Sequence, residues 1–455
     1  MRLIAFATIL VFFFAQFALA RDEIKYMDYI ALSLEEKVQE IDLATIANLV
    51  QRQNIELAIS KNQIKQAEAT MYGSIAGFLP SISFSNSIES FKGGEIIFGA
   101  EPVELDRRTF RPTISLDYQI QTGGKPIFQL MSNVRRLKRA RSAKSTALQG
   151  ALLDASAEYF SWLKDINSLT AAETSLQEAE TQLSLSESRA NNGFATQLEV
   201  MQSKTKLAEA QNIKIRVQNQ AKISETNLAS TLNIPLTTEL KPWSKELKPL
   251  TLYDENLSIA ECMQSAVENR PDIKETFYQI EEARSNLGVA VSELFPVINL
   301  NAYFRGIGPQ PDDLRETRRT FIEARTDLLR NMGVGTIANI KLSKERVKEA
   351  MLRKQAQLNE VQKTLAKAYY DYKLYGDQLK STSTKLESAE EAYRIAINRL
   401  QNGLGQNIDV IQAQTELSLT RLEYQTTVMN YNIAQISLLY ETGRLKPDVL
   451  ASVIE

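Results

Sequence analysis

The chain has 455 residues, of which 44% are hydrophobic and 24% charged, a balance typical of a folded protein rather than a disordered one. Its net charge of −2 provides no global basic surface, so we expect no nucleic-acid partner. With no histidine and a single cysteine, Cys262, the sequence excludes a Ser-His-Asp triad, an internal disulfide and a CxxC site, and we expect no metal or other cofactor.

Residues 1–20 have the organisation of a secretory signal peptide. A basic start is followed by a short apolar run, 3–14, and by the small-residue cleavage site Ala18-Leu19-Ala20. The alternative is an N-terminal membrane anchor, for which the apolar run is short. No later segment is apolar for about 18 residues, so we expect the mature chain to cross a membrane, if at all, only with strands.

The mature chain begins with a predicted helix and two strands. The helix, at 51–78, ends before Pro80, because proline disfavours helical backbone in the residue before it. Two segments then alternate apolar and polar residues, a pattern of either a transmembrane strand or a half-buried sheet in a soluble domain. The apolar positions are Ile82, Phe84 and Ile88 in the first segment, and Ile114, Leu116, Tyr118 and Ile120 in the second.

A long helix is predicted next, from near 131 to 191. Apolar and small residues recur along it with spacings of three and four, the pattern of a coiled-coil seam. At about 1.5 Å per residue this helix is roughly 90 Å long, so it needs neighbours of similar length. Asn192-Gly193 ends it, and a second helix returns at 196–231. The seam consists of Leu152, Ala155, Tyr159, Trp162, Ile166, Leu169, Ala172, Leu176, Ala179, Leu183, Ser186 and Ala190.

Residues 232–258 read as a linker with short irregular structure, since they contain three prolines, Pro235, Pro242 and Pro249. A helix at 272–294 follows the linker and ends before Pro296. A strand is then predicted at 298–305, in the same order as in the first half of the chain.

A fourth strand near 320–332 has a weaker alternation, and surface loops are expected at 92–109 and 306–319. Four strands cannot close a barrel in lipid, where open edges are forbidden and about eight strands is the minimum. If these strands lie in a membrane, several chains must each contribute four. The long helices also need neighbours, so both features predict an oligomer.

The second long helix has the most regular seam in the sequence, within 358–400. It ends at Asn402-Gly403 and returns at 407–440. The segments "ANNGFATQLEVMQ" and "LQNGLGQNIDVIQ" begin at 190 and 400, so the turns share an offset of 400 − 190 = 210 residues. The seam consists of Leu358, Val361, Leu365, Ala368, Tyr372, Tyr375, Leu379, Thr382, Leu386, Ala389, Tyr393, Ala396 and Leu400.

The chain is therefore interpreted as a tandem duplication, with a first repeat at 21–231, a linker region at 232–258 and a second repeat at 259–455. Both repeats contain the pattern R-x3-G-x5-D/E-V, and 269–302 has a helix-to-strand signature. With these features the chain resembles the TolC-like outer membrane efflux proteins over essentially its whole mature length. The pattern residues are Arg189, Gly193, Glu199 and Val200, and Arg399, Gly403, Asp409 and Val410.

The resemblance implies an α+β membrane protein in the outer membrane of a Gram-negative bacterium. Three copies would form a helical barrel of long antiparallel helices, continuous with a shared 12-stranded β-barrel and extending into the periplasm. Such a homotrimer exports small molecules or proteins as the passive exit duct of a tripartite efflux pump or a type I secretion system. Its implied partners are a periplasmic adaptor (membrane fusion) protein, an inner-membrane transporter and outer membrane lipid.

The resemblance also suggests a constriction at the periplasmic end. Asp409 matches an aspartate that the family has there, and Glu199 has the equivalent position in the first hairpin. Where many relatives have a second aspartate this chain has Gln412, and where some have a latch arginine it has Gly405. Both acids could equally be first-turn residues that stabilise a helix N-terminus.

Gly193-Phe194 and Gly403-Leu404 resemble the tip residues that accept the adaptor. An apolar residue after a turn glycine can also be a helix-capping contact. A basic run at 135–141 is interpreted as a solvated face or a membrane flank rather than a nucleic-acid site. Gly123-Gly124-Lys125 lacks the spacing of a phosphate-binding loop.

Two other classes of function are alternatives to the duct. A secreted or periplasmic structural coiled-coil protein without a pore would have the long helices but no reason for paired strands in both halves. An enzyme is disfavoured by the lack of histidine and of any nucleophile motif. The sequence therefore favours the duct.

Overall fold

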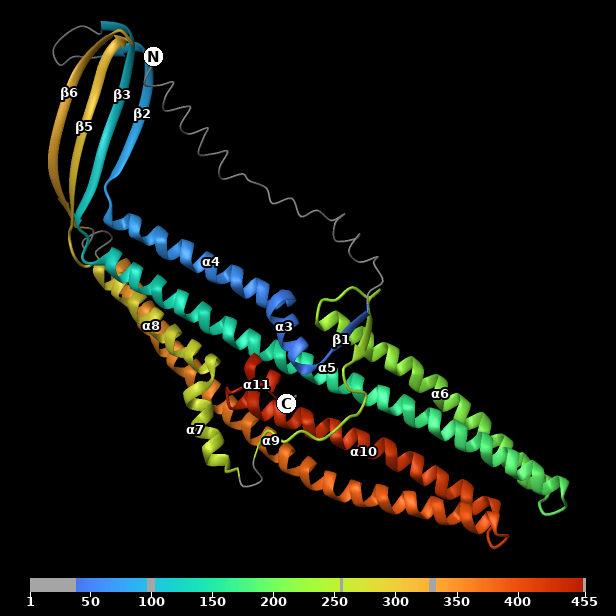
Figure 1. The fold of residues 1–455 in the computed structure, drawn as a ribbon. Helices are drawn as coiled ribbons and strands as arrows, with labels where there is room; N and C mark the ends of the chain where they lie inside the picture. The colour runs from blue at the N-terminus through green and yellow to red at the C-terminus, as the bar shows by residue number, and fades with distance from the viewer. Residues whose placement is uncertain (1–37, 96–102, 254–256, 327–332, 453–455) are drawn as a thin grey trace.

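The computed structural model describes residues 38–95, 103–253, 257–326 and 333–452, so the predicted signal peptide at 1–20 lies outside the described residues. The molecule is elongated, with a curved sheet at one end and the turns of two helical hairpins at the other (Figure 1). Both halves of the chain contribute two strands, one long helix and one returning helix, in the same order. The hairpin turns from the two halves lie at the same end of the molecule.

The four-stranded sheet has the order β2-β3-β5-β6, and all neighbouring strands are antiparallel. The strands are β2 (Ser81–Glu95), β3 (Val103–Gln121), β5 (Val297–Gln310) and β6 (Asp313–Arg325). All four exceed the ten residues that sequence alternation indicated. β6 lies earlier than the predicted strand at 320–332, of which 327–332 lie outside the described residues.

The predicted loops at 92–109 and 306–319 are wrong over most of their described length. Residues 92–95 pair with 103–106, and the ladder between β5 and β6 continues to Gln310 opposite Asp313. Backbone groups form the ladder, so it continues through charged residues that do not alternate in polarity. Only Pro311 and Asp312 separate β5 from β6.

The two faces of the sheet differ in polarity. In the register of the strands Phe84 lies opposite Ile114, which lies opposite Phe304, so these side chains share one face. Ser83, Ser115 and Tyr303 are similarly aligned on the other face. We call these the apolar face and the polar face. The apolar face also has Ile82, Ile88, Leu116, Leu300 and Ile322, and the polar face has Ser81, Ser85, Ser87, Thr113, Asp117 and Asn301.

Four helices form the two hairpins: α5 (Lys125–Asn191) with α6 (Gln197–Thr231), and α9 (Val334–Gln401) with α10 (Asn407–Glu441). With 67 residues α5 is about 100 Å long. Every residue of both predicted seams is buried or half-buried, which confirms the seams. Within the described residues, none of the helices is both long and apolar enough to cross a bilayer.

The helix predicted at 51–78 is interrupted. α3 (Leu43–Gln53) ends and α4 (Ile55–Ile75) begins at Asn54, whose side-chain oxygen accepts a hydrogen bond from the backbone N–H of Leu57 at 2.9 Å. Asn54 therefore caps the start of α4, where its side chain satisfies an N–H group that has no partner within the helix. The backbone of Asn54 is extended, so α3 ends there. Residues Ala76–Phe78 form a short 3-10 helix.

The remaining helices are α7 (Ile259–Asn269), α8 (Pro271–Ser292) and α11 (Pro447–Ala451). Of these, α7 and α11 lie near the middle of the molecule, and α8 runs from there to the base of the sheet (Figure 1). α8 agrees with the prediction of a helix at 272–294. Within the predicted linker, β4 (Glu239–Pro242) pairs in parallel with β1 (Val38–Ile41), so this region is more regular than the sequence indicated.

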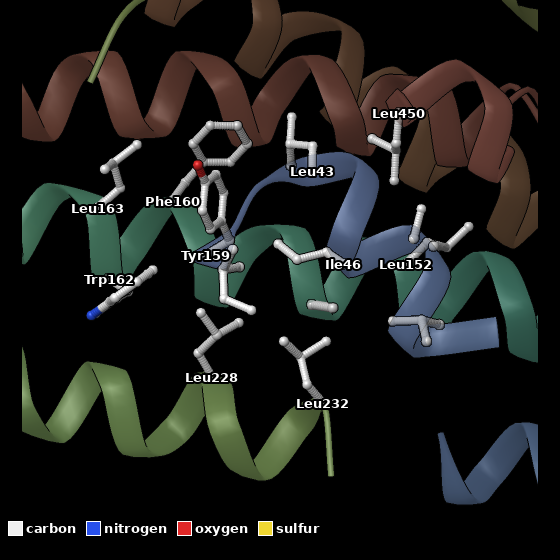
Figure 2. Close-up of a cluster of buried hydrophobic side chains, with 14 of the residues drawn as sticks. Leu43, Ile46, Leu152, Tyr159, Phe160, Trp162, Leu163, Leu228, Leu232 and Leu450 are labelled. Atoms are coloured by element: carbon white, nitrogen blue, oxygen red, sulfur yellow. The ribbon is translucent and has the colours of Figure 1, made fainter. Parts of the chain in front are cut away.

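The main hydrophobic core lies at the middle of α5, where α3, α6 and α10 converge on it (Figure 2). Trp162 is 2% exposed and Leu152 is fully buried. Tyr159 packs against Phe160 with ring centroids 5.4 Å apart, and Leu228 of α6 and Leu232, which follows α6, lie on the opposite side (Figure 2). This core fixes the point from which both hairpins extend to their turns.

Candidate functional site

The two hairpin turns have the same backbone geometry. Gly193 and Gly403 have left-handed φ angles of +76° and +73°. The N–H of Gly193 donates to the carbonyl of Ala190 at 3.0 Å, and that of Phe194 donates to the carbonyl of Arg189 at 2.8 Å. This pair of hydrogen bonds is the Schellman helix end, which favours glycine at its left-handed position. The second turn repeats both bonds at Gly403 and Leu404.

The arginines of the duplicated pattern stabilise these turns. The guanidinium of Arg189 donates to the carbonyl of Phe194 at 3.4 Å, and that of Arg399 donates to the carbonyl of Leu404 at the same distance. Arg189 also donates to the carbonyl of Leu400 at 2.6 Å, so it links the end of α5 to the end of α9. The spacing R-x3-G thus has a local structural cause.

Phe194 and Leu404, the apolar residues after the turn glycines, point into solvent. Phe194 is 75% exposed and Leu404 is 74% exposed. A side chain so exposed gains little from packing against its own helix, which argues against the alternative of a capping contact. Two large apolar side chains at the end of the molecule are available to a partner.

Both predicted constriction acids lie in the first turn of a returning helix, where they form capping boxes. The carboxylate of Glu199 accepts a hydrogen bond from the N–H of Thr196 at 3.1 Å. Asp409 accepts one from the N–H of Gln406 at 3.2 Å. Both acids therefore stabilise the start of a helix, which was the alternative to a constriction. One carboxylate oxygen of each acid remains for other contacts.

The surroundings of the three constriction candidates differ. Asp409 and Gln412 are exposed on α10, three residues apart, whereas Glu199 is half-buried. The two hairpins meet beside Glu199, because the side chain of Asn407 donates to its carbonyl oxygen at 3.3 Å. The candidates thus occupy one end of the protomer.

A buried polar cluster joins the hairpins next to these acids, and the sequence reasoning did not identify it. Asn407, which is 3% exposed, donates to the hydroxyl of Ser203 at 3.2 Å, and its carbonyl oxygen accepts from Gln182. Ser186 bonds to Ser203 at 2.9 Å. The signal that could have revealed it is a serine, Ser186, at a position of the seam that is usually apolar.

Further from the turns, α5 and α10 remain joined by polar contacts. Ser175 bonds to Ser418 at 3.1 Å, and Arg421 forms an ion pair with Glu178 at 3.4 Å. A cavity of about 110 Å³ lies between α5, α6 and α10, and most of its surface is apolar. These contacts hold the two hairpins of one protomer side by side.

The basic run at 135–141 is not simply a solvated face. Arg136 and Arg139 both form ion pairs with Glu282 of α8, at 3.1 and 3.0 Å, and Arg141 pairs with Glu68 of α4 at 3.1 Å. The run therefore joins α5 to its neighbours below the sheet. Within the described chain, no group of three or more histidine, cysteine, aspartate or glutamate residues could hold a metal ion.

Comparison with protein families gives a match over most of the chain. The family described as outer membrane efflux protein matches residues 46–233 and 262–444. The solvent efflux pump outer membrane protein SrpC of Pseudomonas putida is 25% identical over 349 residues, which cover 71% of this chain and 69% of that protein. The probable efflux pump outer membrane protein TtgC of Pseudomonas putida is 22% identical over 289 residues, 62% of this chain.

This chain spans 57% of the length of TtgC in that alignment. Among solved structures, the outer membrane protein VceC of Vibrio cholerae superimposes with a TM-score of 0.75 at 18% identity. The superposition covers 88% of this chain and 96% of VceC. At such low identity the structural comparison establishes the fold, an assembly of helical hairpins continuous with a sheet.

Proposed function

The chain belongs to the outer membrane efflux protein family, as its TolC-like sequence features predicted, and we propose that it is a passive exit duct. Three copies close a shared barrel of twelve strands, four from each chain, in the outer membrane of a Gram-negative bacterium. The helices of the three copies form a tunnel that extends into the periplasm. The duct exports small molecules or proteins and performs no catalysis.

The observation that carries the proposal is a sheet with two unlike faces and two open edges. Within the described residues, β2 and β6 are the outer strands of the sheet, and each has a neighbour on one side only. Unpaired backbone groups are costly in lipid, and pairing β6 of one copy with β2 of the next removes both edges. The apolar face then contacts lipid and the polar face lines the bore.

The helices support the same assembly. Neighbour contacts run α4-α5-α8-α9 near the sheet and α6-α5-α10-α9 near the turns, so each layer ends in helices with one uncovered side. Large apolar side chains on the end helices are more than half exposed, a feature expected of an interface with a second copy. They include Ile55, Ile59 and Tyr72 on α4, and Ile337, Leu352 and Tyr370 on α9.

The hairpin turns form the entrance of the duct in this proposal. Asp409, Glu199 and Gln412 from three copies surround the constriction, and rings of acids favour cations there. Gly193, Phe194, Gly403 and Leu404 receive a periplasmic adaptor protein, which connects the duct to an inner-membrane transporter. The duct serves a tripartite efflux pump or a type I secretion system, and the transporter selects the cargo.

A coiled-coil protein without a pore explains fewer of these features. It accounts for the hairpins, but it gives no role to an apolar sheet face with Ile82 at 73% and Ile88 at 63% exposure. Such a surface in water promotes aggregation.

Conductance in planar lipid bilayers tests the proposal. Purified protein should insert and produce discrete current steps of uniform size, because the bore is defined by a fixed number of strands. Protein that folds and binds detergent yet never carries current would contradict the proposal.

The same bilayers test the constriction. We expect Asp409→Asn to change conductance or to reduce cation selectivity, since it removes three charges from the narrow end while the amide oxygen can still cap the helix. Gln412→Glu is the matched opposite change, and it should increase cation selectivity. Two channels that both remain identical to wild type would exclude Asp409 and Gln412 from the constriction.

A further inference from the structure

The polar face of the sheet changes character along the strands. Near the helices it has Ser81, Ser83, Ser115 and Asn301, with Asp117 among them. Arginines begin with Arg319, in the same row as Ser115, and recur towards the end remote from the helices, where Glu89 and Asp313 also lie on this face. The arginines are Arg107 and Arg111 on β3, Arg305 on β5, and Arg315 and Arg319 on β6. We call these five residues the arginine band.

The register brings the members of the band together. Arg305 lies opposite Thr113 on one side and Thr317 on the other. Arg111 and Arg319 are each two residues from those positions, and residues two apart on a strand share a face. Arg111 and Arg319 are therefore each a diagonal neighbour of Arg305, on opposite sides of it along the strands.

The side chains of the band are held on the polar face. Arg305 donates a hydrogen bond to the hydroxyl of Thr113 at 3.3 Å and lies over the ring of Tyr303 at 4.7 Å. Arg319 lies over the ring of Phe321 at 5.2 Å. None of these contacts neutralises a charge, so both guanidinium groups keep their charge and their remaining donors.

The charges of the band are only partly balanced. Arg111 forms an ion pair with Glu89 at 2.9 Å, and Asp313 lies on the same face two residues from Arg315, so these two acids offset two of the five positive charges. Like charges at neighbouring positions on one sheet face destabilise the fold. A group of arginines with a net positive charge is therefore costly for folding alone and is explained better by a ligand of opposite charge.

We propose that the arginine band is an anion-selective filter in the outer half of the bore. This inference rests on the proposed function, since the band lines a bore only if the polar face does. Three copies place up to fifteen arginines around one section of the bore, and planar guanidinium groups bind carboxylate, phosphate and sulfonate groups. The filter favours the passage of anionic solutes at the exit, whatever charge preference the acids set at the entrance.

The test measures how strongly a polyanion blocks the channel current. It compares substitutions of arginines on the polar face with a substitution of an arginine on the apolar face. Tripolyphosphate is added on the side of the sheet while single channels are recorded, for wild type, Arg305→Gln and the double variant Arg305→Gln/Arg319→Gln. Arg318→Gln is the matched control, because Arg318 precedes Arg319 but lies on the apolar face, over the ring of Phe304 at 5.4 Å.

We expect tripolyphosphate to reduce the wild-type current, and about tenfold more of it to be required for the double variant, since fields in a charged cleft concentrate counter-ions at least that much. Arg305→Gln should be intermediate and Arg318→Gln unchanged. The block should weaken greatly in 1 M salt, where the screening length is only about 3 Å.

Two outcomes would overturn the filter while leaving the duct intact: conducting channels that tripolyphosphate does not block, and block that is the same in wild type and in the double variant. An equal effect of Arg318→Gln would also contradict it, because that side chain is outside the bore. If the double variant does not assemble, Arg305→Gln alone decides. Protein that never conducts would instead contradict the proposed function.

Discussion

Glycines with left-handed backbone end three of the helices that define this molecule. Gly193, Gly403 and Gly443 have φ angles of +76°, +73° and +70°. The turns at Gly193 and Gly403 could be predicted from sequence, because Asn-Gly after a helical seam is a strong helix-ending signal. The role of Gly443 could not be predicted, since it depends on a helix distant in the sequence.

Gly443 and Gly193 provide a matched pair of substitutions. A β-carbon at Gly443 would lie 2.7 Å from the backbone nitrogen of Arg270, whereas one at Gly193 would meet nothing within 4 Å. Gly193→Ala should cost about 1–2 kcal/mol through its backbone conformation alone. Gly443→Ala adds a clash with rigid backbone, so its melting temperature should fall further in a thermal melt in detergent. Equal melting temperatures would contradict the close packing.

Glu275 gives the stability of the helical region a dependence on pH. Burial raises its pKa, an effect that the hydrogen bond from Thr146 and the charge of Arg139 offset in part and that of Asp272 reinforces. Between the ordinary value of 4.5 and the raised pKa, the folded chain binds more protons than the unfolded one. Stability therefore falls as pH rises through this interval, and the loss persists above it.

The substitution Glu275→Gln tests that dependence. It should raise the melting temperature at neutral pH, where the wild-type carboxylate is charged and half-buried, and should have little effect below the ordinary pKa, where both side chains are neutral. Melts across this pH range measure the difference. A difference between the two proteins that does not vary with pH would show that Glu275 titrates normally.

At the scale of helices and strands, the regularity with which apolar residues recur in the sequence determined which elements could be predicted. The seams of α5 and α9 follow a regular spacing, so their course was predictable, although both helices begin earlier than the seams. The strands were underestimated, because charged segments such as 313–319 have no alternation and yet continue the ladder. The buried cluster around Asn407 could not be predicted, since it forms only when α5, α6 and α10 meet.

The junction of α7 and α8 contains a buried charged group. Arg270 is 6% exposed and forms ion pairs with Asp272 at 2.6 Å and with Glu441 at the end of α10. Its guanidinium also lies over the ring of Tyr440 at 5.5 Å. Arg270 thus connects the junction of α7 and α8 to the end of α10.

Removing this arginine leaves two carboxylates without their partner. Arg270→Met should therefore destabilise the fold by about 3–5 kcal/mol. Arg353→Met is the control, because Arg353 pairs with Glu349 on the exposed surface of α9, where ion pairs contribute little. Thermal melts of both variants in detergent provide the comparison, and an equal small effect would show that Arg270 is dispensable.

At the scale of the whole molecule, the described chain has the features expected of one part of the proposed closed structure. The sheet has four strands, the end helices have apolar uncovered sides, and the two hairpins reach the same end. The prediction of an oligomer followed from strand number and helix length, which could be inferred from the sequence. The number of copies did not follow from them, and it rests on resemblance to a family.

The mass of the assembly extracted from outer membranes tests the central claim most directly. Native mass spectrometry of the protein in mild detergent should show a complex of three chains, since three sets of four strands close the proposed barrel. A monodisperse monomer that is stable in water without detergent would contradict the account, because one chain cannot enclose a bore.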